Sequence, residues 1–245
     1  MSEKIRILFL SANPLPTGRI LVDLEAKEVR KKLEEGPYRD KFEFEKHEAI
    51  EPVDIQKLLL KHRPHIVHFC GHGHKSQQRI ILSGAPGRAK TVDKQGLAQV
   101  FALYNHHVRL VVLNACYTNT IASSITKAVD YAIGSGKGIG DKAGVAFAAA
   151  LYRALGFGKS VKEAFASAKA ELGLTKMPRS QGIQLFVRDG LNERDSFPCA
   201  PDIGLMVRRA DLRSVCRITV FESLSITRSG KRVCLRRQKY VGVQA

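Results

Sequence analysis

The sequence predicts an α/β fold in which a mostly parallel sheet is covered by helices on both faces. Short apolar, β-branched runs alternate with amphipathic segments from the start of the chain to about residue 190, which is typical of strands and helices in succession. One run, RLVVL at 109–113, is apolar after its first residue, as strands buried on both faces are. The 245 residues, 44% hydrophobic and 26% charged, suffice for one core of ordinary size.

The expected strands are short and end at loops rich in glycine or polar residues. They are residues 5–10, 42–48, 66–70, 79–82, 109–113, 131–134 and 183–187. The expected helices carry apolar side chains at helical spacing and begin at capping residues or proline. They are residues 23–35, 52–62, 93–104, 120–129, 141–155 and 160–172. Asp23 is the expected cap of the first helix, and Leu24, Val29 and Leu33 are expected to face the core.

The regular alternation ends near residue 190. Residues 191–245 hold eleven Lys and Arg against five Asp and Glu, and therefore contribute +6 of the net charge of +17. Weak β signals occur at 216–221 and 231–235. We therefore expect a first domain over residues 1–190 and a basic C-terminal extension over residues 191–245. The extension fits a small β appendage, a disordered tail or a piece of a neighbouring module equally well.

Charge, hydropathy and cysteine content limit the class of protein. The basic charge attracts phosphate, but it is spread along the chain and is not interleaved with aromatic residues, so nucleic-acid binding is left open and not favoured. The opening MSEKIRILFL lacks the features of a signal peptide, and no run of about 18 apolar residues follows. We expect a cytoplasmic protein without membrane association. The five cysteines form no CxxC pair and are expected to be free thiols.

A histidine and a cysteine each follow an apolar strand, in the stretches HFCGHGH at 68–74 and LNACYT at 113–118. The carboxyl ends of parallel strands gather functional groups, so His72 and Cys116 lie close together if strands 66–70 and 109–113 are neighbours. An imidazole within reach activates a thiol as a nucleophile. Gly73 allows its own N–H to approach an oxyanion, and the Cys116 amide would be the second donor. Taken singly, each is more simply an ordinary buried cysteine or loop histidine; together they indicate a nucleophilic site.

A zinc site is the first alternative for the same stretch. Four potential ligands are spaced by two residues: His68, Cys70, His72 and His74. The intervening glycines should break the strand, and ligands in strict alternation along a strand diverge, so no metal is expected there. His106 and His107 are expected at the surface.

A phosphate cradle is the second alternative, at the glycine-rich stretch 134–140 ahead of a helix. It matches neither GxGxxG nor GxxxxGK[ST], and a loop that flanks the substrate is the simpler interpretation. No cofactor is expected.

VHFCGHG and VVLNACYT resemble the histidine and cysteine motifs of the CHAT family, caspase-like peptidases related to caspases, metacaspases and separases. The resemblance extends to SANPLPTGRILVDLEAKEV, to HRPHIVHF and to VDYAIGSGKGIGDKAGVAFAAALYRALGFGKSVKEAF, and covers about residues 3–188. It implies a caspase-like three-layer sandwich and a cysteine endopeptidase that needs no metal or organic cofactor. His72 would be the general base and acid, Cys116 the nucleophile, and the N–H groups of Gly73 and Cys116 the oxyanion hole.

The chain departs from the family pattern at Cys70, where a small residue such as serine is expected, and from the sequence we expect no repeat or sensor region of the kind that often accompanies the domain. The stretch between Cys116 and Tyr131 is also too short for the cleavable linker of a caspase. The resemblance implies a protein or peptide substrate, room for a regulatory protein partner, and a role in prokaryotic signalling or defence. The alternative is a catalytically silent caspase-like module that binds other proteins.

Two residues imply opposite choices at P1, the substrate residue that precedes the cleaved bond. Asp141 matches an acidic position that lies near the pocket for a basic P1 residue in separase-like relatives; its other role is a plain helix N-cap. Arg19 is placed like a caspase arginine that binds an acidic P1 residue. We favour a basic P1 residue, because we expect Asp141 to be buried near the site whereas Arg19 can be solvated.

Overall fold

A computed structural model describes residues 4–14, 17, 20–75, 78–84 and 88–191 with their side chains, and the backbone of 219–228 and 231–240. The chain falls into two compact units, Met1–Ile203 and Gly204–Ala245. Each unit is described by itself. No helix within the described ranges is both long and apolar enough to cross a bilayer.

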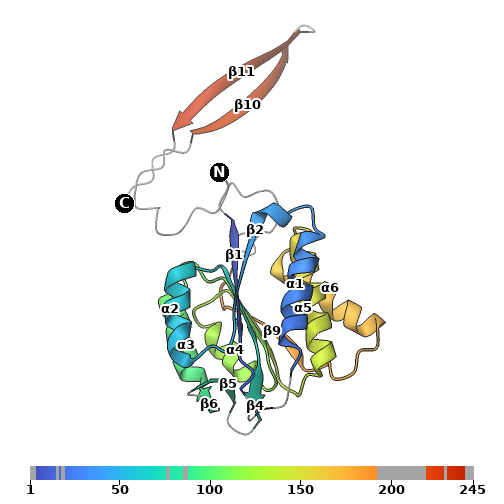
Figure 1. The fold of residues 1–245 in the computed structure, drawn as a ribbon. Coiled ribbons are helices and arrows are strands. Elements are labelled where there is room, and N and C mark those ends of the chain that lie inside the picture. Colours follow the sequence, from blue (N-terminus) through green and yellow to red (C-terminus); the bar gives the residue numbers. More distant parts are fainter. Residues whose placement is uncertain are drawn as a thin grey trace. The chain divides into compact units, whose positions relative to one another are not determined.

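A six-stranded sheet lies at the centre of the first unit (Figure 1), with the strand order β2-β1-β3-β7-β8-β9. The strands are β1 (Ile5–Ser11), β2 (Phe42–His47), β3 (Ile66–Cys70), β7 (Leu110–Asn114), β8 (Tyr131–Ser135) and β9 (Ile183–Val187). Strands β2, β1, β3, β7 and β8 pair in parallel, and β9 pairs antiparallel to β8. The predicted, mostly parallel sheet is confirmed.

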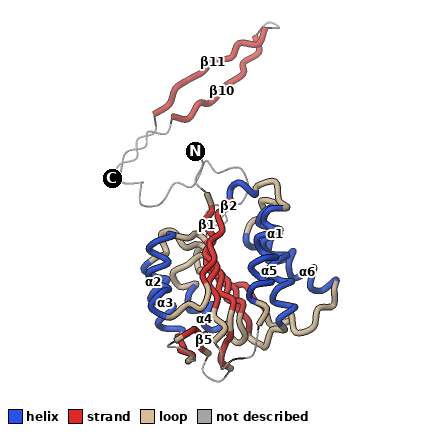
Figure 2. The backbone as a smooth tube through the Cα atoms, in the orientation of Figure 1, coloured by secondary structure: helices blue, strands red, loops and turns tan. Residues whose placement is uncertain are grey.

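Helices cover both faces of this sheet, so that the unit has three layers (Figures 1 and 2). One layer holds α1 (Val22–Glu34), α5 (Asp141–Gly156) and α6 (Val161–Leu174). The other holds α2 (Pro52–His62), α3 (Lys94–Leu103) and α4 (Asn119–Ile125). The short 3-10 helix η1 (Arg39–Lys41) precedes β2.

Capping explains where two of these helices start. A capping box of Glu51 and Asp54 opens α2, and one of Ser160 and Glu163 opens α6. The start of α1 differs from the prediction. Its N-cap is Leu21, and Asp23 lies inside the first turn, where it pairs with Lys46 instead of capping.

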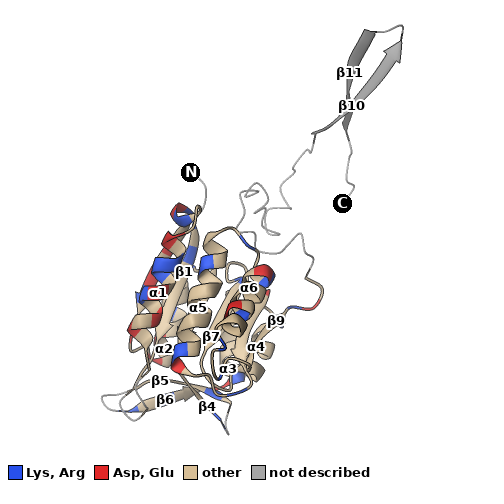
Figure 3. Cartoon of the chain, turned by 90° about the vertical axis from the view of Figure 1, so that its right-hand side faces the viewer, with Lys and Arg blue, Asp and Glu red and all other residues tan. Residues whose placement is uncertain are grey.

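The core-facing side of α1 also differs from the prediction. Val29 and Leu33 are buried as expected, but Leu24 is 42% exposed, and Glu25 is 3% exposed in its place. Charged side chains of both signs lie along this helix (Figure 3). The burial of Glu25 is possible because hydrogen-bond donors from the sheet reach it, a feature that helical spacing does not reveal.

A second, three-stranded antiparallel sheet follows β3, with β4 (His72–His74), β5 (Arg79–Ser83) and β6 (Ala89–Val92) in that order. The expected break occurs at Gly71, which is a bend, but Gly73 lies inside β4 and does not end it. Strand β6 was not expected from the sequence; its AKTV run is short and mostly exposed.

The expectation of a surface position is wrong for His107. This residue is buried, and its Nδ1 donates a hydrogen bond to the Pro64 carbonyl 3.1 Å away. Burial, followed by the charge of His106, lowers the pKa of His107 from 6.5 to about 4. His106 is exposed, as expected.

An antiparallel hairpin of β10 (Thr219–Arg228) and β11 (Lys231–Tyr240) forms the described part of the second unit. The weak β signals overlap both strands, although residues 216–218 lie outside the described residues. The boundary at residue 190 stays a prediction.

Candidate functional site

Strands β1, β3 and β7 end at residues that pair with one another across the sheet. A polar residue or cysteine follows two positions after the end of each strand. Ser11 of β1 pairs with Cys70 of β3, and Cys70 pairs with Asn114 of β7. Two residues beyond these partners are Asn13, His72 and Cys116. The strands before His72 and Cys116 are therefore neighbours, which is the condition under which the sequence brings the two residues together, and their loops leave the sheet side by side.

The backbone of Gly73 lies directly against that of Cys116. A Cβ atom at Gly73 would fall 1.7 Å from the Cys116 carbonyl oxygen and 3.3 Å from the Cys116 nitrogen. No side chain fits into this space, so glycine is required here by close approach of two backbones. The contact brings the segment that carries His72 against the segment that carries Cys116.

His72 and Cys116 line one pocket with a volume of about 270 Å³. Its acidic residues are Glu25 and Asp141; no Lys or Arg lines it within the described residues. Apolar and polar residues complete the wall: Ile20, Leu21, Cys70, Gly71, Asn114, Ala115, Ile139, Gly140, Gly144 and Val145.

The Cys116 side chain is held from the glycine-rich stretch. The half-buried Sγ accepts a hydrogen bond from the Ile139 N–H at 3.2 Å, and the end of the stretch 134–140, at Ile139 and Gly140, lines the pocket. Tyr117, the next residue, has a φ of 57°, in the left-handed region that non-glycine residues seldom adopt. Such backbone strain is found most often at functional sites.

Asn13 contacts the His72 ring, and sequence reasoning missed it. His72 Nε2 and Asn13 Oδ1 are 3.3 Å apart. A carbonyl oxygen only accepts hydrogen bonds, so the neutral ring carries its proton on Nε2, and Nδ1 is its basic nitrogen. The sequence signal was present, because Asn13 follows a buried strand just as His72 and Cys116 do.

Glu25, which reaches the pocket from α1, is the second residue that the sequence did not reveal. Its Oε1 lies 2.7 Å from both His68 Nε2 and Asn114 Nδ2, and its Oε2 accepts a hydrogen bond from the Cys70 thiol at 3.3 Å. Among the ion pairs of the described residues, its partner is His68 and no Lys or Arg. Three donors therefore hold a buried carboxylate at the pocket wall.

His68 links this carboxylate to α5, which lies in the same helical layer as α1. The ring is fully buried, stacks on Phe9 with centroids 4.7 Å apart, and lies 3.2 Å from the Tyr152 hydroxyl through Nδ1. Burial, and then the charge of Glu25, raises the pKa of Tyr152 well above its ordinary value. Through His68, the carboxylate on α1 is thus connected to both β3 and α5.

Cys70 is buried beneath the pocket. Burial is the main reason that the pKa of its thiol is raised far above the ordinary range, and the charge of Glu25 adds to it. The thiol is therefore held in its protonated, unreactive form.

Asp141 lines the pocket from the first turn of α5, but it is exposed, and the expectation of burial is wrong. The N-cap of α5 is Gly140, so the simple capping role is also excluded. The helix starts at the pocket mouth, and its first side chain therefore meets solvent. Arg19 lies outside the described residues; the expectation about it is not examined by the structure.

One domain family and two proteins named as proteases match this sequence. A model of the CHAT domain family matches residues 12–185. A Roc-COR-CHAT protease from an unknown prokaryotic organism is 25% identical over 182 residues, which are 71% of this chain and 17% of that protein. A probable protease from Gillisia limnaea is 22% identical over 131 residues, 53% of this chain and 23% of that protein. The chain thus spans about a fifth of the length of these relatives.

Three solved structures share the fold. A secreted C11 cysteine protease from Bacteroides thetaiotaomicron, in complex with an irreversible peptide inhibitor, has a TM-score of 0.51 at 14% identity and covers 75% of this chain and 66% of its own. The Arg-specific cysteine proteinase gingipain R has a TM-score of 0.53 at 11% identity, and the match covers 75% of this chain and 46% of the gingipain chain. Caspase-1 from Spodoptera frugiperda has a TM-score of 0.53 at 12% identity, and the match covers 76% of this chain and 87% of the caspase chain.

These neighbours confirm the caspase-like α/β sandwich, and the match to the family model covers more than half of the sequence. The chain belongs to the CHAT domain family.

Proposed function

We propose that this chain is a cysteine endopeptidase in which His72 and Cys116 form the catalytic dyad. One observation carries the proposal: the two residues line a single pocket at the ends of adjacent strands, where the Gly73 backbone lies against Cys116. A thiol, an imidazole and closely spaced backbone amides are the groups that acyl transfer requires. The relatives and fold neighbours named as proteases support the same class of reaction.

In the proposed reaction, the proton of the Cys116 thiol passes to His72, and the thiolate attacks the carbonyl carbon of the peptide. The C–N bond then breaks, the amine leaves with the proton from His72, and a thioester remains on Cys116. Water attacks the thioester while His72 takes a proton from it. The C–S bond breaks, the acid product leaves, and the thiolate is restored. The N–H groups of Gly73 and Cys116 stabilise the oxyanion of each tetrahedral intermediate.

Asn13 is the proposed positioning residue for His72. By accepting from Nε2, its side chain holds the ring in the tautomer that presents Nδ1 as the base. A third group that orients the base completes the arrangement common to Cys–His catalysis on unrelated folds.

The preferred P1 residue is proposed to be basic. The pocket wall carries two carboxylates, and no Lys or Arg within the described residues offsets them. Among the described residues, the partner of the buried Glu25 is His68 and no Lys or Arg, and the exposed Asp141 also lines the pocket. Two opposite charges 4 Å apart attract by about 4 kcal/mol at an effective dielectric of about 20, before desolvation is subtracted. A guanidinium or ammonium group is the side chain that gains from this field.

A thiol-directed peptide probe tests the proposal. Wild type is expected to be labelled on Cys116, with labelling lost in Cys116→Ala and strongly reduced in His72→Ala. Cys70→Ser is the matched control, because it removes a neighbouring thiol that is buried and unreactive. Equal labelling of all four proteins would contradict the enzyme and favour a silent module that binds other proteins. A role in prokaryotic signalling or defence stays a prediction.

A further inference from the structure

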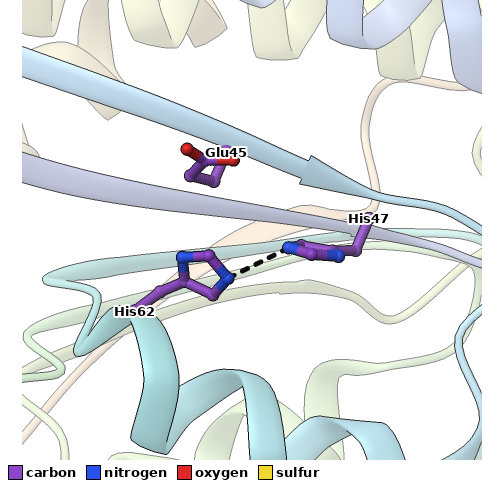
Figure 4. A group of neighbouring side chains, drawn as sticks. All are labelled: Glu45, His47 and His62. Carbon is purple, nitrogen blue, oxygen red and sulfur yellow. Dashed lines mark hydrogen bonds between the residues drawn. The ribbon is translucent and has the colours of Figure 1, made fainter.

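Glu45, His47 and His62 form a group of potential metal ligands at the edge of the central sheet (Figure 4). One ligand atom from each residue lies within 4.8 Å of those of the other two. None of the three lines the pocket that contains His72 and Cys116. The group therefore has no part in the proposed peptidase chemistry and needs an explanation of its own.

The fold brings the three side chains together from two elements. Glu45 and His47 are two residues apart on β2, so they project from the same side of the strand. His62 is the last residue of α2, and its ring points toward His47 in Figure 4. The group thus joins the edge strand β2 to the helix α2 beside it. The two histidines are 15 residues apart in the sequence.

The distance between the two rings fits a shared metal ion. His47 Nε2 and His62 Nε2 are 3.1 Å apart. Two histidine nitrogens bound to zinc at about 2.0–2.1 Å with a tetrahedral angle lie about 3.3–3.4 Å apart. The rings would have to separate by only a few tenths of an ångström to accept the ion. A hydrogen bond between neutral rings accounts for the pair, but it leaves the nearby Glu45 carboxylate without a role.

Groups of both signs surround the two histidines. Glu45 and Asp54 supply negative charge near His47, and Lys61 supplies positive charge. Within the group itself, the Glu45 carboxylate is the anionic ligand, and the two rings supply nitrogen ligands.

We propose that Glu45, His47 and His62 bind one Zn²⁺ ion. Two imidazole nitrogens and one carboxylate oxygen suit zinc and other nitrogen-preferring metals, whereas calcium and magnesium prefer oxygen ligands alone. Three protein ligands leave a fourth tetrahedral position for water. The ion would join β2, which pairs with β1 at the edge of the sheet that the described residues form, to α2. Its expected effect is to stabilise this edge of the sheet.

Zinc titration of the full chain tests the proposal in a Cys116→Ala background, which removes the thiol of the candidate dyad as a competing ligand. Competition with a chromophoric chelator is expected to show one equivalent of Zn²⁺ whose affinity falls at least a hundredfold in His47→Asn and in His62→Asn. Glu45→Gln, which keeps the shape of the side chain, is expected to lose about tenfold. His106→Asn is the matched control, because His106 is an exposed histidine outside the group, and it should bind as the parent does.

Cobalt replaces zinc in a second readout that identifies the ligands. The visible spectrum of the Co²⁺ form is expected to show four-coordinate nitrogen and oxygen ligation, with no sulfur-to-metal band, and to lose intensity in His47→Asn. Zinc should also raise the unfolding temperature of the parent and leave that of His47→Asn unchanged. Equal zinc affinity in the parent, His47→Asn and Glu45→Gln would overturn the proposal. A sulfur band that persists in these variants would assign the metal to the cysteines instead. If His47→Asn does not fold, the zinc affinity of Glu45→Gln tests the proposal instead. Glu45 is exposed, so we expect this variant to fold as the parent does.

Discussion

Glu25 Oε1 lies 2.7 Å from His68 Nε2, with the two side chains 4% and 0% exposed. The pair joins α1 to β3 inside the core, and the carboxylate also borders the pocket of the candidate dyad. A carboxylate buried at this place is costly unless donors or cations satisfy it. Its donors come from the protein, and the substrate is the proposed source of a cation.

The first prediction concerns the choice of P1. Glu25→Gln removes the buried charge, so the ratio of kcat/KM for an arginine substrate to that for its neutral isostere citrulline is expected to fall at least tenfold. Asp141→Asn should lower the same ratio less, because Asp141 is exposed and its field is screened by water. Peptide pairs that differ only at P1 give the measurement. An unchanged ratio in Glu25→Gln would refute the role of this residue.

The second prediction concerns Asn13. Asn13→Ala removes the acceptor from His72 Nε2, so kcat is expected to fall about tenfold while KM changes little. Asn13→Asp restores an acceptor, and should shift the acidic limb of the pH–rate profile upward because a nearby carboxylate favours the imidazolium. Steady-state rates across pH report both effects. A rise in KM at constant kcat would place Asn13 in substrate binding instead.

Selective alkylation is the third prediction. Iodoacetamide at neutral pH is expected to modify Cys116 and to spare Cys70, because Cys70 is buried and the pKa of its thiol is raised. Peptide mapping by mass spectrometry separates the two sites. Under denaturing conditions both cysteines should react, which serves as the control. Equal modification of both in the native protein would show that Cys70 is accessible.

Two glycine substitutions make the fourth prediction. In Gly73→Ala the new methyl group would meet the Cys116 carbonyl, so activity is expected to fall at least a hundredfold and stability by about 1–3 kcal/mol. Gly173→Ala, in α6, meets no atom within 4 Å and should stabilise the protein by up to about 1 kcal/mol. Denaturant unfolding and peptidase assays compare the pair. Full activity in Gly73→Ala would mean that the two backbones can separate without loss.

The fifth prediction is a pH dependence of stability from His107. Its pKa is about 4 in the folded protein and 6.5 in the unfolded chain. Below pH 6.5, His107 binds a proton in the unfolded chain but not in the folded protein. The free energy of unfolding therefore decreases as the pH falls from 6.5 to about 4. The loss from this residue is at most about 3 kcal/mol. His107→Gln should flatten the free energy of unfolding between pH 6.5 and 4 relative to wild type; parallel curves would argue against it.

The sequence by itself determined most strands and helices of the first unit in their chain order, with the exception of β4 and β6. These features depend on local patterns: apolar runs for the buried strands, helical spacing and capping residues for the helices. Because His72 and Cys116 each follow such a run by two or three residues, the sequence placed both at the carboxyl ends of parallel strands, whereas the fold decided that the two strands are neighbours.

Only the tertiary structure decided which polar groups are buried. Helical spacing assigned Leu24 to the core of α1, but Glu25 lies there, because donors on β3 and β7 meet it from far along the chain. His107 is buried by its contact with Pro64, and Asp141 is exposed because α5 begins at the pocket mouth. Local patterns specify the period of an element, whereas the partners of its polar side chains depend on segments that only the folded chain brings together.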